Sequence, residues 1–533
     1  MSKTCRTCQT VFEVTESDLA FLKKVSPIIA GKRYDIPTPT LCPECRLQRR
    51  MAWRNDRNLY SRTCDFSGEK IISMFRPDPK VKVYKSDIWW GDGYDARTFG
   101  RDYDFSRSFF EQLNELIQTV PWPSLAAPDC ENSPYVNYAY KNQNCHLCFA
   151  GNFLQDSYYC YNGENSRDCC DCLFINDCEN CYELVHCENC YNTKFAVNSK
   201  NCSESWFLQD CRSLKNCLLC FNLEHQEYHI LNQPYSKEEY QRKLKEYRLD
   251  THQGLERAKK IFLDQRQTHE RRPDQNFMTE DCSGEYLNQS KNCQQCYILQ
   301  KQGEDCKYAF NGFPRIKDAM DIFFCGEDAE LIYESVATGG TGQRLLFNNG
   351  VVLGVENVLY SIWAVGCKDC FGCVNLRKGQ YCILNKQYSK TEYEKLVPKI
   401  IEHMKNSSAS AEWGEFPDAK YSPFGYNETS AQENFPLEKE QAQKQGFNWS
   451  DYQSPLPKVE KTLPASRLPE AVKDIPDDVL NWAILCEETQ RPYKIVAQEL
   501  RFYRKHQLPL PRRHPDVRHN ERLKLRNPRT KWK

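Results

Sequence analysis

The chain has 533 residues, with 72 lysines and arginines against 72 aspartates and glutamates, so its formal net charge is zero. A length of roughly 150 residues per domain predicts three or four structural units. The balanced charge excludes a protein that is basic throughout. Basic residues are nevertheless concentrated near both ends of the chain, which leaves a phosphate-bearing partner plausible.

The sequence also indicates a cellular compartment. No stretch approaches the roughly 18 consecutive apolar residues of a membrane-spanning helix. Residues 1–5 lack the apolar run of a secretory signal. We therefore expect a cytoplasmic protein without membrane contact, in which the 30 cysteines are buried thiols or metal ligands, because disulfides are rare in a reducing compartment.

Two pairs of cysteines with CxxC spacing lie near the N-terminus. Four thiolates in this arrangement form a closed tetrahedral zinc site. Its role is structural, because no ligand position is left open for water or substrate. The predicted zinc ligands are Cys5, Cys8, Cys42 and Cys45.

The residues around these pairs resemble the bacterial "probable zinc-ribbon" family, which is of treble-clef type. Gln9 stands where the family commonly has glycine, and the loop between the pairs is long. The whole chain also resembles uncharacterised bacterial proteins that carry this domain. The resemblance implies zinc binding and no particular reaction. It is carried by Cys5, Cys8, Phe12, Val14, Thr15, Asp18, Phe21, Pro39, Cys42, Pro43, Cys45 and Arg46.

An arginine-rich segment follows the second cysteine pair, where a treble clef usually continues as a helix. Guanidinium groups pair with phosphates in a bidentate manner, and the neighbouring Trp53 and Tyr60 could stack on bases. The alternative is that the two aromatic residues pack the helix against its neighbour while the arginines are only solvated. The candidate phosphate-binding residues are Arg46, Arg49, Arg50, Arg54 and Arg57.

Residues 61–129 are expected to form a small mixed α/β unit. Ser108 and Glu111 have the spacing of a capping box, which predicts a helix with Leu113, Leu116 and Ile117 on one face.

The chain then repeats itself with a 21-residue period. Cysteines recur at this step in two series, which end at Cys211 and Leu223, and after the first cysteine of each series every position is preceded by Asn or Asp. A fixed short period is typical of a solenoid, and this one fits a single turn of a parallel β-helix. Asn and Asp tolerate the left-handed backbone of its bends. The first series is Cys148, Cys169, Cys190 and Cys211, and the second begins with Cys160, Cys181 and Cys202.

The same region contains many CxxC pairs, and Cys367, Cys370 and Cys373 form a CxxCxxC. Such cysteines could hold zinc or an iron–sulfur cluster. Leucine replaces cysteine at two equivalent positions, Leu214 and Leu223. We therefore favour free thiols stacked in a solenoid core, where cysteine behaves as a small hydrophobic residue.

Two similar segments end the two solenoids. Each contains a capping box, Ser236 with Glu239 and Ser389 with Glu392, which predicts a helix that covers the exposed core. Residues 406–470 are polar and rich in Ser, Pro, Glu and Gln, which indicates a flexible linker.

The C-terminal residues 509–532 align without a gap to residues 37–60. Thr489 and Val517 stand where the N-terminal copy has two cysteines, so the second copy is expected to have lost its metal but kept its arginines. Its candidate phosphate-binding residues are Arg512, Arg513, Arg518, Arg522, Arg526 and Arg529.

The predicted fold is mainly β, with two parallel β-helix segments, helical caps, an N-terminal zinc-binding module and a degenerate C-terminal copy. The predicted parts are a zinc ribbon or treble clef (1–60), a mixed α/β unit (61–129), a first β-solenoid (130–235), a helical connector (236–272), a second β-solenoid (273–388), a capping helix (389–405), a flexible linker (406–470) and a metal-free ribbon with a basic tail (471–533).

The hypothesis that follows is a non-enzymatic zinc protein whose arginine-rich modules bind nucleic acid or a nucleoprotein surface. One alternative is a scaffold that binds protein partners on the solenoid flanks. Another is a carbohydrate-active β-helix enzyme. Its conceivable catalytic acids are Asp156, Asp171 and Asp177. Only the analogy of fold supports this alternative.

Overall fold

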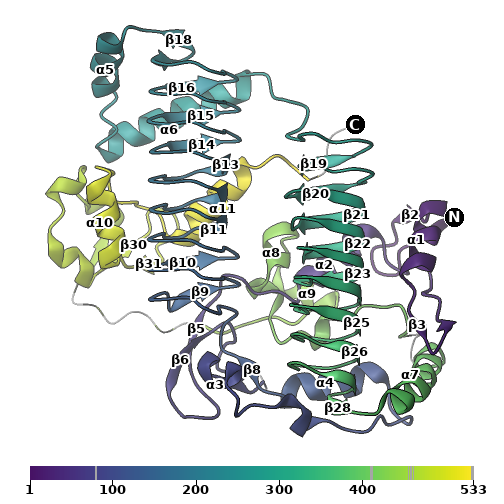
Figure 1. Cartoon of the computed structure of the whole chain (residues 1–533). Coiled ribbons are helices and arrows are strands. Elements are labelled where there is room, and N and C mark those ends of the chain that lie inside the picture. The colour runs from purple at the N-terminus through teal and green to yellow at the C-terminus, as the bar shows by residue number, and fades with distance from the viewer. Residues whose placement is uncertain (79–80, 408–411, 454, 456–458, 460, 530–533) are drawn as a thin grey trace. The chain divides into compact units, whose positions relative to one another are not determined.

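The computed structural model describes residues 1–78, 81–407, 412–453, 455, 459 and 461–529. The chain divides into two compact units, each built from separate stretches of sequence. Unit 1 comprises residues 1–124, 274–452 and 529–533, and unit 2 comprises residues 125–273 and 453–528. Each unit combines a module from one end of the chain with a large, mostly parallel sheet (Figure 1).

Unit 1 begins with a small module, residues 1–60, which we call the N-terminal module. Strands β1 (Ser2–Thr4) and β2 (Val11–Glu13) form a hairpin, followed by helix α1 (Glu16–Val25), a second hairpin of β3 (Ile28–Ile29) and β4 (Lys32–Arg33), and helix α2 (Pro43–Met51). Thr15 and Asp18 cap α1 reciprocally. The helix predicted after the second cysteine pair is confirmed as α2.

The following segment is mixed α/β, as predicted. Helix α4 (Phe109–Thr119) begins at Ser108, whose side chain accepts a hydrogen bond from the Glu111 backbone, and Leu113, Leu116 and Ile117 are buried. Its other elements are β5 (Tyr60–Thr63), β6 (Lys70–Ser73), β7 (Val83–Tyr84), α3 (Ser86–Trp90), the 3-10 helix η1 (Ala96–Phe99) and β8 (Trp122–Pro123).

Residues 130–234 of unit 2, here called the first stack, contain a ten-stranded sheet in which strands follow in chain order. All pairs are parallel except the last hairpin. The strands are β9 (Tyr135–Asn137), β10 (His146–Phe149), β11 (Tyr161–Glu164), β12 (Leu173–Asn176), β13 (Val185–Glu188), β14 (Lys194–Val197), β15 (Trp206–Gln209), β16 (Leu218–Phe221), β17 (His229–Ile230) and β18 (Gln233–Pro234).

From β10 to β17, successive strands of the first stack pair at a 12-residue offset, while β9 and β10 pair with a register shift. Tyr161 pairs with Leu173, which pairs with Val185. Bridges outside the strands keep the same offset, for example Arg167 with Glu179. Each such stretch, here called a rung, therefore lies beside the rung before it. The predicted 21-residue turn is wrong.

A three-residue period explains this error. Every third residue has a left-handed backbone, with φ of +50° at Asp177, +57° at Asn180 and +53° at Asn189. The residue after most of these, such as Cys178 or Cys181, is buried. Because 9, 12 and 21 are all multiples of three, residues at all three spacings share an inward orientation, but only residues 12 apart lie beside one another on successive rungs.

The core of the first stack is a cluster of buried thiols with a few aliphatic side chains. Thiols donate to backbone carbonyls of their own and the next rung, as Cys187 does to Val185 at 3.5 Å and Ala196 at 3.4 Å. All 30 cysteines are free. This arrangement agrees with the preferred interpretation of stacked thiols.

Residues 277–387 of unit 1, here called the second stack, form another ten-stranded sheet in chain order. Its central strands pair at a 13-residue offset, and its last parallel strands at a 12-residue offset. The strands are β19 (Gly284–Leu287), β20 (Cys296–Leu299), β21 (Gly303–Gly312), β22 (Ile316–Cys325), β23 (Ala329–Val336), β24 (Gly342–Leu346), β25 (Val355–Leu359), β26 (Lys368–Phe371), β27 (Gln380–Ile383) and β28 (Lys386–Gln387).

A helix follows the final hairpin of each stack, as the two capping boxes predicted. Helix α5 (Lys237–Glu246) begins after Ser236 and α7 (Lys390–Lys405) after Ser389, both with reciprocal capping. Each buries a tyrosine, Tyr240 or Tyr393. Helix α6 (His252–Thr268) completes the connector in unit 2.

The segment expected to be a flexible linker is packed in unit 1 over residues 412–452. It contains α8 (Ser430–Asn434) and α9 (Lys439–Lys444), and Trp413, Phe416 and Tyr426 are almost fully buried. These aromatic residues anchor an otherwise polar stretch, so the linker prediction is wrong there. Residues 408–411, 454, 456–458 and 460 lie outside the described residues.

Residues 461–528 of unit 2, here called the C-terminal module, repeat the order of the N-terminal module. Strand β30 (Trp482–Leu485) forms a hairpin with β31 (Pro492–Tyr493), followed by α10 (Ala497–Lys505) and α11 (Pro515–Leu525), while β29 (Lys461–Pro464) joins β30 on its other side.

Candidate metal centre and buried arginine clusters

The four predicted zinc ligands meet in the N-terminal module. Their sulfur atoms all lie within 4.8 Å of one another, and the sulfurs of Cys8 and Cys42 are 3.6 Å apart. Zinc–sulfur bonds of about 2.3 Å in a tetrahedron place sulfurs about 3.8 Å apart, so the geometry fits zinc. Among the described residues, only this group brings three or more such ligand atoms together.

Local structure positions these sulfurs. The Cys5 amide donates to Thr10 at 2.9 Å and the Gln9 amide to Cys5 at 3.1 Å, which closes a tight turn. Gln9 takes a left-handed φ of +60°, a backbone conformation that glycine adopts most readily. Hydrogen bonds from the side chain and backbone of Thr10 lower the pKa of Cys8 to about 6, whereas burial raises the pKa of Cys42 and of Cys45.

The C-terminal module has the same turn without the full ligand set. The Cys486 amide donates to Arg491 at 3.0 Å and the Gln490 amide to Cys486 at 2.9 Å, with φ of +57° at Gln490. Thr489, His514 and Val517 occupy the positions of the other three cysteines.

The arginines of α2 lie against acidic residues of the second stack. Arg50 is fully buried and donates to Asp321 at 3.1 Å and to Glu334 at 2.7 Å. Arg46, one helical turn earlier, donates to Asp321 at 2.8 Å. Both acids are buried and come from neighbouring rungs, with left-handed φ of +56° and +45°.

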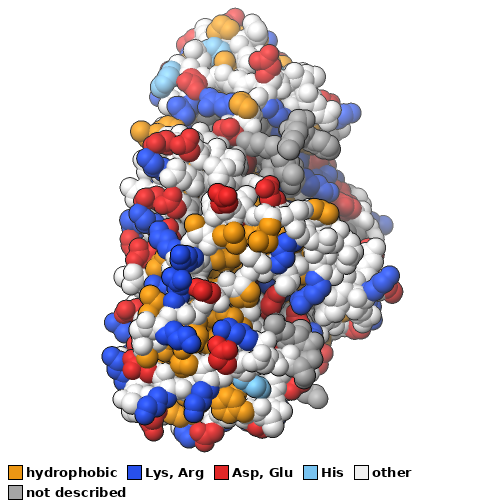
Figure 2. All heavy atoms as spheres, turned by 90° about the vertical axis from the view of Figure 1, so that its right-hand side faces the viewer, with side chains coloured by type: hydrophobic (Ala, Val, Ile, Leu, Met, Phe, Trp, Pro, Cys, Tyr) orange, Lys and Arg blue, Asp and Glu red, His pale blue; other side chains and the backbone are white. Residues whose placement is uncertain are grey.

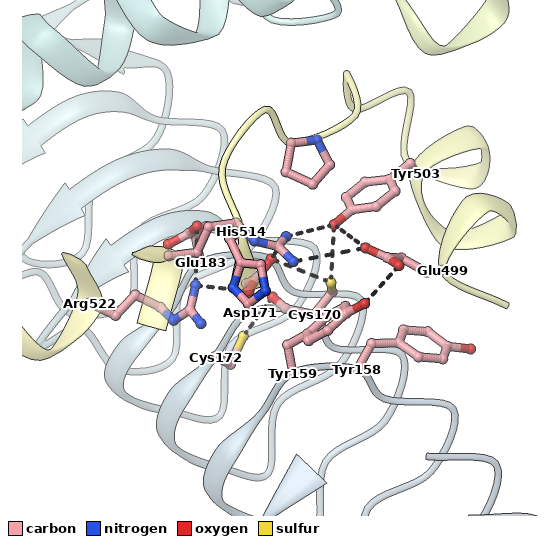
Figure 3. A network of polar contacts seen from close by, with 12 residues as sticks. Tyr158, Tyr159, Cys170, Asp171, Cys172, Glu183, Glu499, Tyr503, His514 and Arg522 are labelled. Atoms are coloured by element: carbon pink, nitrogen blue, oxygen red, sulfur yellow. Dashed lines mark hydrogen bonds and ion pairs between the residues drawn. The ribbon is translucent and has the colours of Figure 1, made fainter. Parts of the chain in front are cut away.

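Helix α11 repeats this arrangement on the first stack. The Arg522 guanidinium is 2.9 Å from Asp171 and 3.3 Å from Glu183, while Arg518 pairs with Asp171 (Figure 3). Asp171 and Glu183 also have left-handed backbones on neighbouring rungs. All four side chains are buried.

The two spacings match, which explains the pairing. Adjacent parallel strands lie about 4.8 Å apart, and residues i and i+4 of a helix are separated by about 6 Å along its axis. Two arginines on one helical face therefore meet two acids on successive rungs. We call each set of two arginines and two acids a clamp: Arg46, Arg50, Asp321 and Glu334 in unit 1, and Arg518, Arg522, Asp171 and Glu183 in unit 2.

The clamp in unit 2 extends into a further buried network. Glu499 accepts hydrogen bonds from the hydroxyls of Tyr159 at 2.9 Å and Tyr503 at 3.2 Å, and Arg518 also donates to Tyr503 at 3.1 Å. Burial raises the pKa of the Glu499 carboxyl to about 7. The thiol of Cys170 lies 3.7 Å from the Tyr503 hydroxyl (Figure 3).

The structure corrects the expectation of arginine-rich faces open to phosphates. Six of the eleven candidate arginines are buried, and ten have carboxylate partners within the protein. The buried residues are Arg46, Arg49, Arg50, Arg54, Arg518 and Arg522, and the other paired residues are Arg57, Arg512, Arg513 and Arg529.

The remaining candidates are also held internally. Arg526 lies over the ring of Phe174, 5.9 Å from its centroid. Trp53 is buried against Phe416, and Tyr60 donates to Glu428, so neither is placed as a platform for bases. For these two aromatic residues, the packing alternative is correct.

The acids of the clamps are the important residues that sequence reasoning missed. Asp171 was considered only as a conceivable catalytic acid, whereas it is buried between two arginines. The available signal was a pair of acids one rung apart, Asp171 with Glu183 and Asp321 with Glu334, but it requires the rung length to be known.

None of the described helices is both long and apolar enough to cross a membrane. The chain matches no protein-family model and no curated protein.

Proposed function

We propose that this chain is a non-enzymatic zinc-binding scaffold, in which two β-solenoids are each held by a ribbon-type module and offer rigid flanks to protein partners. The parallel strand order and the regular offset between successive strands support the solenoid assignment. The four-cysteine group supports a zinc ribbon of treble-clef type at the N-terminus.

The observation that carries the proposal is the position of the arginines. A nucleic-acid protein needs basic side chains that remain free to replace counterions on phosphates. Here Arg50 and Arg522 are fully or almost fully buried and neutralised by acids of the stacks. The modules thus use their arginines to grip the stacks, which favours the scaffold over the nucleic-acid hypothesis.

The exposed flank of the second stack has the mixed charge of a protein-binding surface. Lysines and glutamates alternate along one column of successive rungs, with Lys291 3.0 Å from Glu280 and Lys317 2.9 Å from Glu304. Farther along the column, Lys368 is 3.5 Å from Glu356. Acidic and basic side chains are also interspersed on the face shown in Figure 2. Such patterns select partners by charge complementarity.

The test is quantitative co-purification from cells of the source organism with the full zinc-loaded chain. One variant carries Lys291→Glu, Lys317→Glu and Lys368→Glu, and a matched variant carries Arg167→Glu, Lys200→Glu and Lys215→Glu on the first stack. We expect a protein partner to co-purify in a stoichiometric amount, including after nuclease treatment. One of the two charge-reversal variants should no longer co-purify it.

The opposite result is equally clear. Nucleic acid is indicated as the ligand if nuclease treatment abolishes the recovery of the partner and if binding weakens 10³-fold or more between about 50 and 200 mM salt. That outcome contradicts the scaffold proposal.

A further inference from the structure

Unit 2 contains an open hollow of about 470 Å³ beside the first stack. Its walls include Tyr191, Lys194 and Trp206 from the stack and Lys505 and His506 from the end of α10. This volume lies within the range of small-molecule sites, roughly 300–1,000 Å³.

The equivalent place in unit 1 is built differently. The column Tyr182, Lys194 and Trp206 corresponds to Tyr333, Leu346 and Leu359 of the second stack, since both tyrosines precede the clamp glutamate. Leu346 and Leu359 are buried. Unit 2 therefore has an ammonium group and an indole where unit 1 has two aliphatic side chains.

The segment that connects the two helices of each module also differs between the units next to this hollow. In both modules a lysine near the end of the first helix pairs with an aspartate of the stack, Lys24 with Asp318 and Lys505 with Asp168. Unit 1 continues with residues 26–42, which include the β3–β4 hairpin, whereas unit 2 has only residues 506–514 before α11.

A side chain fills the corresponding space in unit 1. Arg344 donates to the backbone carbonyls of Val25 at 3.1 Å and Ser26 at 2.9 Å. The equivalent residue in unit 2 is the shorter Asn192. The hollow thus results from a shorter connection between the two helices and from one shorter side chain, Asn192, at this site of unit 2.

The lining combines aromatic surfaces with fixed polar groups. Lys194 is only 3% exposed, and its ammonium lies 5.5 Å from the Trp206 ring centroid while donating to Asn192. Burial lowers the pKa of Lys194 to about 8. Tyr191 is 48% exposed. Asn180 accepts from Lys505 at 2.9 Å.

The positive and negative side chains around the hollow nearly balance, which argues against a phosphate ligand. Asp168 neutralises Lys505 and contacts His506 at 3.2 Å, and Glu204 accepts from Asn192 at 2.5 Å near Lys194. A saccharide matches this lining. Its C–H face is apolar and suits an aromatic ring, and its hydroxyls both donate and accept, as amides do.

We propose that this hollow binds a saccharide, with a sugar ring against Trp206 and its hydroxyls bonded by Lys194 and the neighbouring amides. The inference goes beyond the scaffold role and does not depend on it, because it concerns a small-molecule site in unit 2 and not the flanks of the stacks.

The first experiment is affinity electrophoresis of the full zinc-loaded chain in gels that contain soluble starch, hydroxyethylcellulose, xylan, galactomannan or glycol chitin. Calorimetry with the matching hexasaccharide then gives the dissociation constant. We expect at least one polysaccharide to retard the protein. The double variant Lys194→Leu with Trp206→Leu, which copies the column of unit 1, should weaken binding at least 10-fold.

Two further variants keep the test decisive. Tyr191→Ala changes an exposed side chain at the hollow and should also weaken binding, whereas Phe153→Ala changes an exposed aromatic residue elsewhere on the first stack and should not. The proposal is overturned if no polysaccharide retards the wild-type chain or if the double variant binds as the wild type does. AMP serves as a phosphate-bearing probe for the alternative ligand. The proposal is also overturned if the wild-type chain binds AMP but no glycan and the same variants lose AMP binding.

Discussion

Arg50 and Arg522 occupy equivalent positions in the two units: each pairs with an aspartate and a glutamate from successive rungs of a stack. The two arginines lie at corresponding sites of α2 and α11, which share the sequence order of their modules. One structural solution is therefore used twice, with the N-terminal module on the second stack and the C-terminal module on the first.

The clamp acids are expected to stabilise each unit strongly. Asp171→Ala leaves two buried guanidinium groups without their shared partner, and breaking a buried ion pair costs about 3–5 kcal/mol. The matched control is Glu179→Ala, which removes an exposed pair with Arg167 at 2.8 Å and should cost about 1 kcal/mol or less. Urea unfolding monitored by tryptophan fluorescence measures both. Equal losses in the two variants contradict a stabilising role for the clamp.

Metal content tests the N-terminal site. The wild-type chain should contain about one zinc, because four thiolates form one closed site. Cys42→Ser should lose it and destabilise the N-terminal module, since metal binding is linked to folding. Cys367→Ser, in the second stack, is the control and should keep the metal. Mass spectrometry of anaerobically purified protein measures the metal content. Iron in the wild-type chain that is absent from the Cys367→Ser variant would show a different kind of centre.

The C-terminal module should accept a second metal when its ligands are restored. Thr489→Cys together with Val517→Cys adds two thiols to Cys486 and His514, which completes a set typical of structural zinc. We expect about two zinc ions per chain in the double variant. Each single substitution offers only three ligands and should remain near one. A double variant that also stays at one zinc means that the two modules are not geometrically equivalent.

Stability should fall as the pH rises through the range in which Glu499 titrates. Burial raises the pKa of this carboxyl to about 7 from an ordinary 4.5, with Arg518 lowering and Asp171 raising it. The folded state therefore holds the proton more tightly than the unfolded state, so the free energy of unfolding decreases between about pH 4.5 and 7. A shift of this size corresponds to at most ~3–4 kcal/mol.

Replacing the carboxyl removes this dependence. Glu499→Gln should flatten the profile of urea midpoints between pH 5 and 8, and the variant should exceed the wild type in stability at pH 8. Glu179→Gln, at a partly exposed position, is the control. A wild-type profile that rises across this range has the wrong sign for the proposed protonation.

Thiol labelling tests the core of stacked cysteines. Cys130 and Cys282 are half-buried, whereas the other thiols of the stacks are buried. Brief alkylation of the native, zinc-loaded chain should modify these two first, and all 30 cysteines should react after unfolding. Peptide mass spectrometry identifies the sites. Thiols that resist alkylation after unfolding without reductant would indicate disulfides.

Several features could be predicted from short stretches of sequence. The four-cysteine group that could hold a metal, the helix after Cys42 and the caps at Ser236 and Ser389 each depend on residues a few positions apart. The buried cysteines after Asn or Asp also follow from a local rule, because these residues readily adopt the left-handed bend.

The sequence by itself determined which residues face inward, because side-chain direction follows the local backbone. It could not determine the rung length: in the first stack every spacing that is a multiple of three preserves that direction, and only the hydrogen bonds between rungs show which offset each stack uses. Whether the arginines are buried or exposed was likewise decided only by the tertiary structure. Arg50 meets Glu334 across 284 residues of chain, and whether a charge binds a partner or is buried depends on the surface that folding brings opposite it.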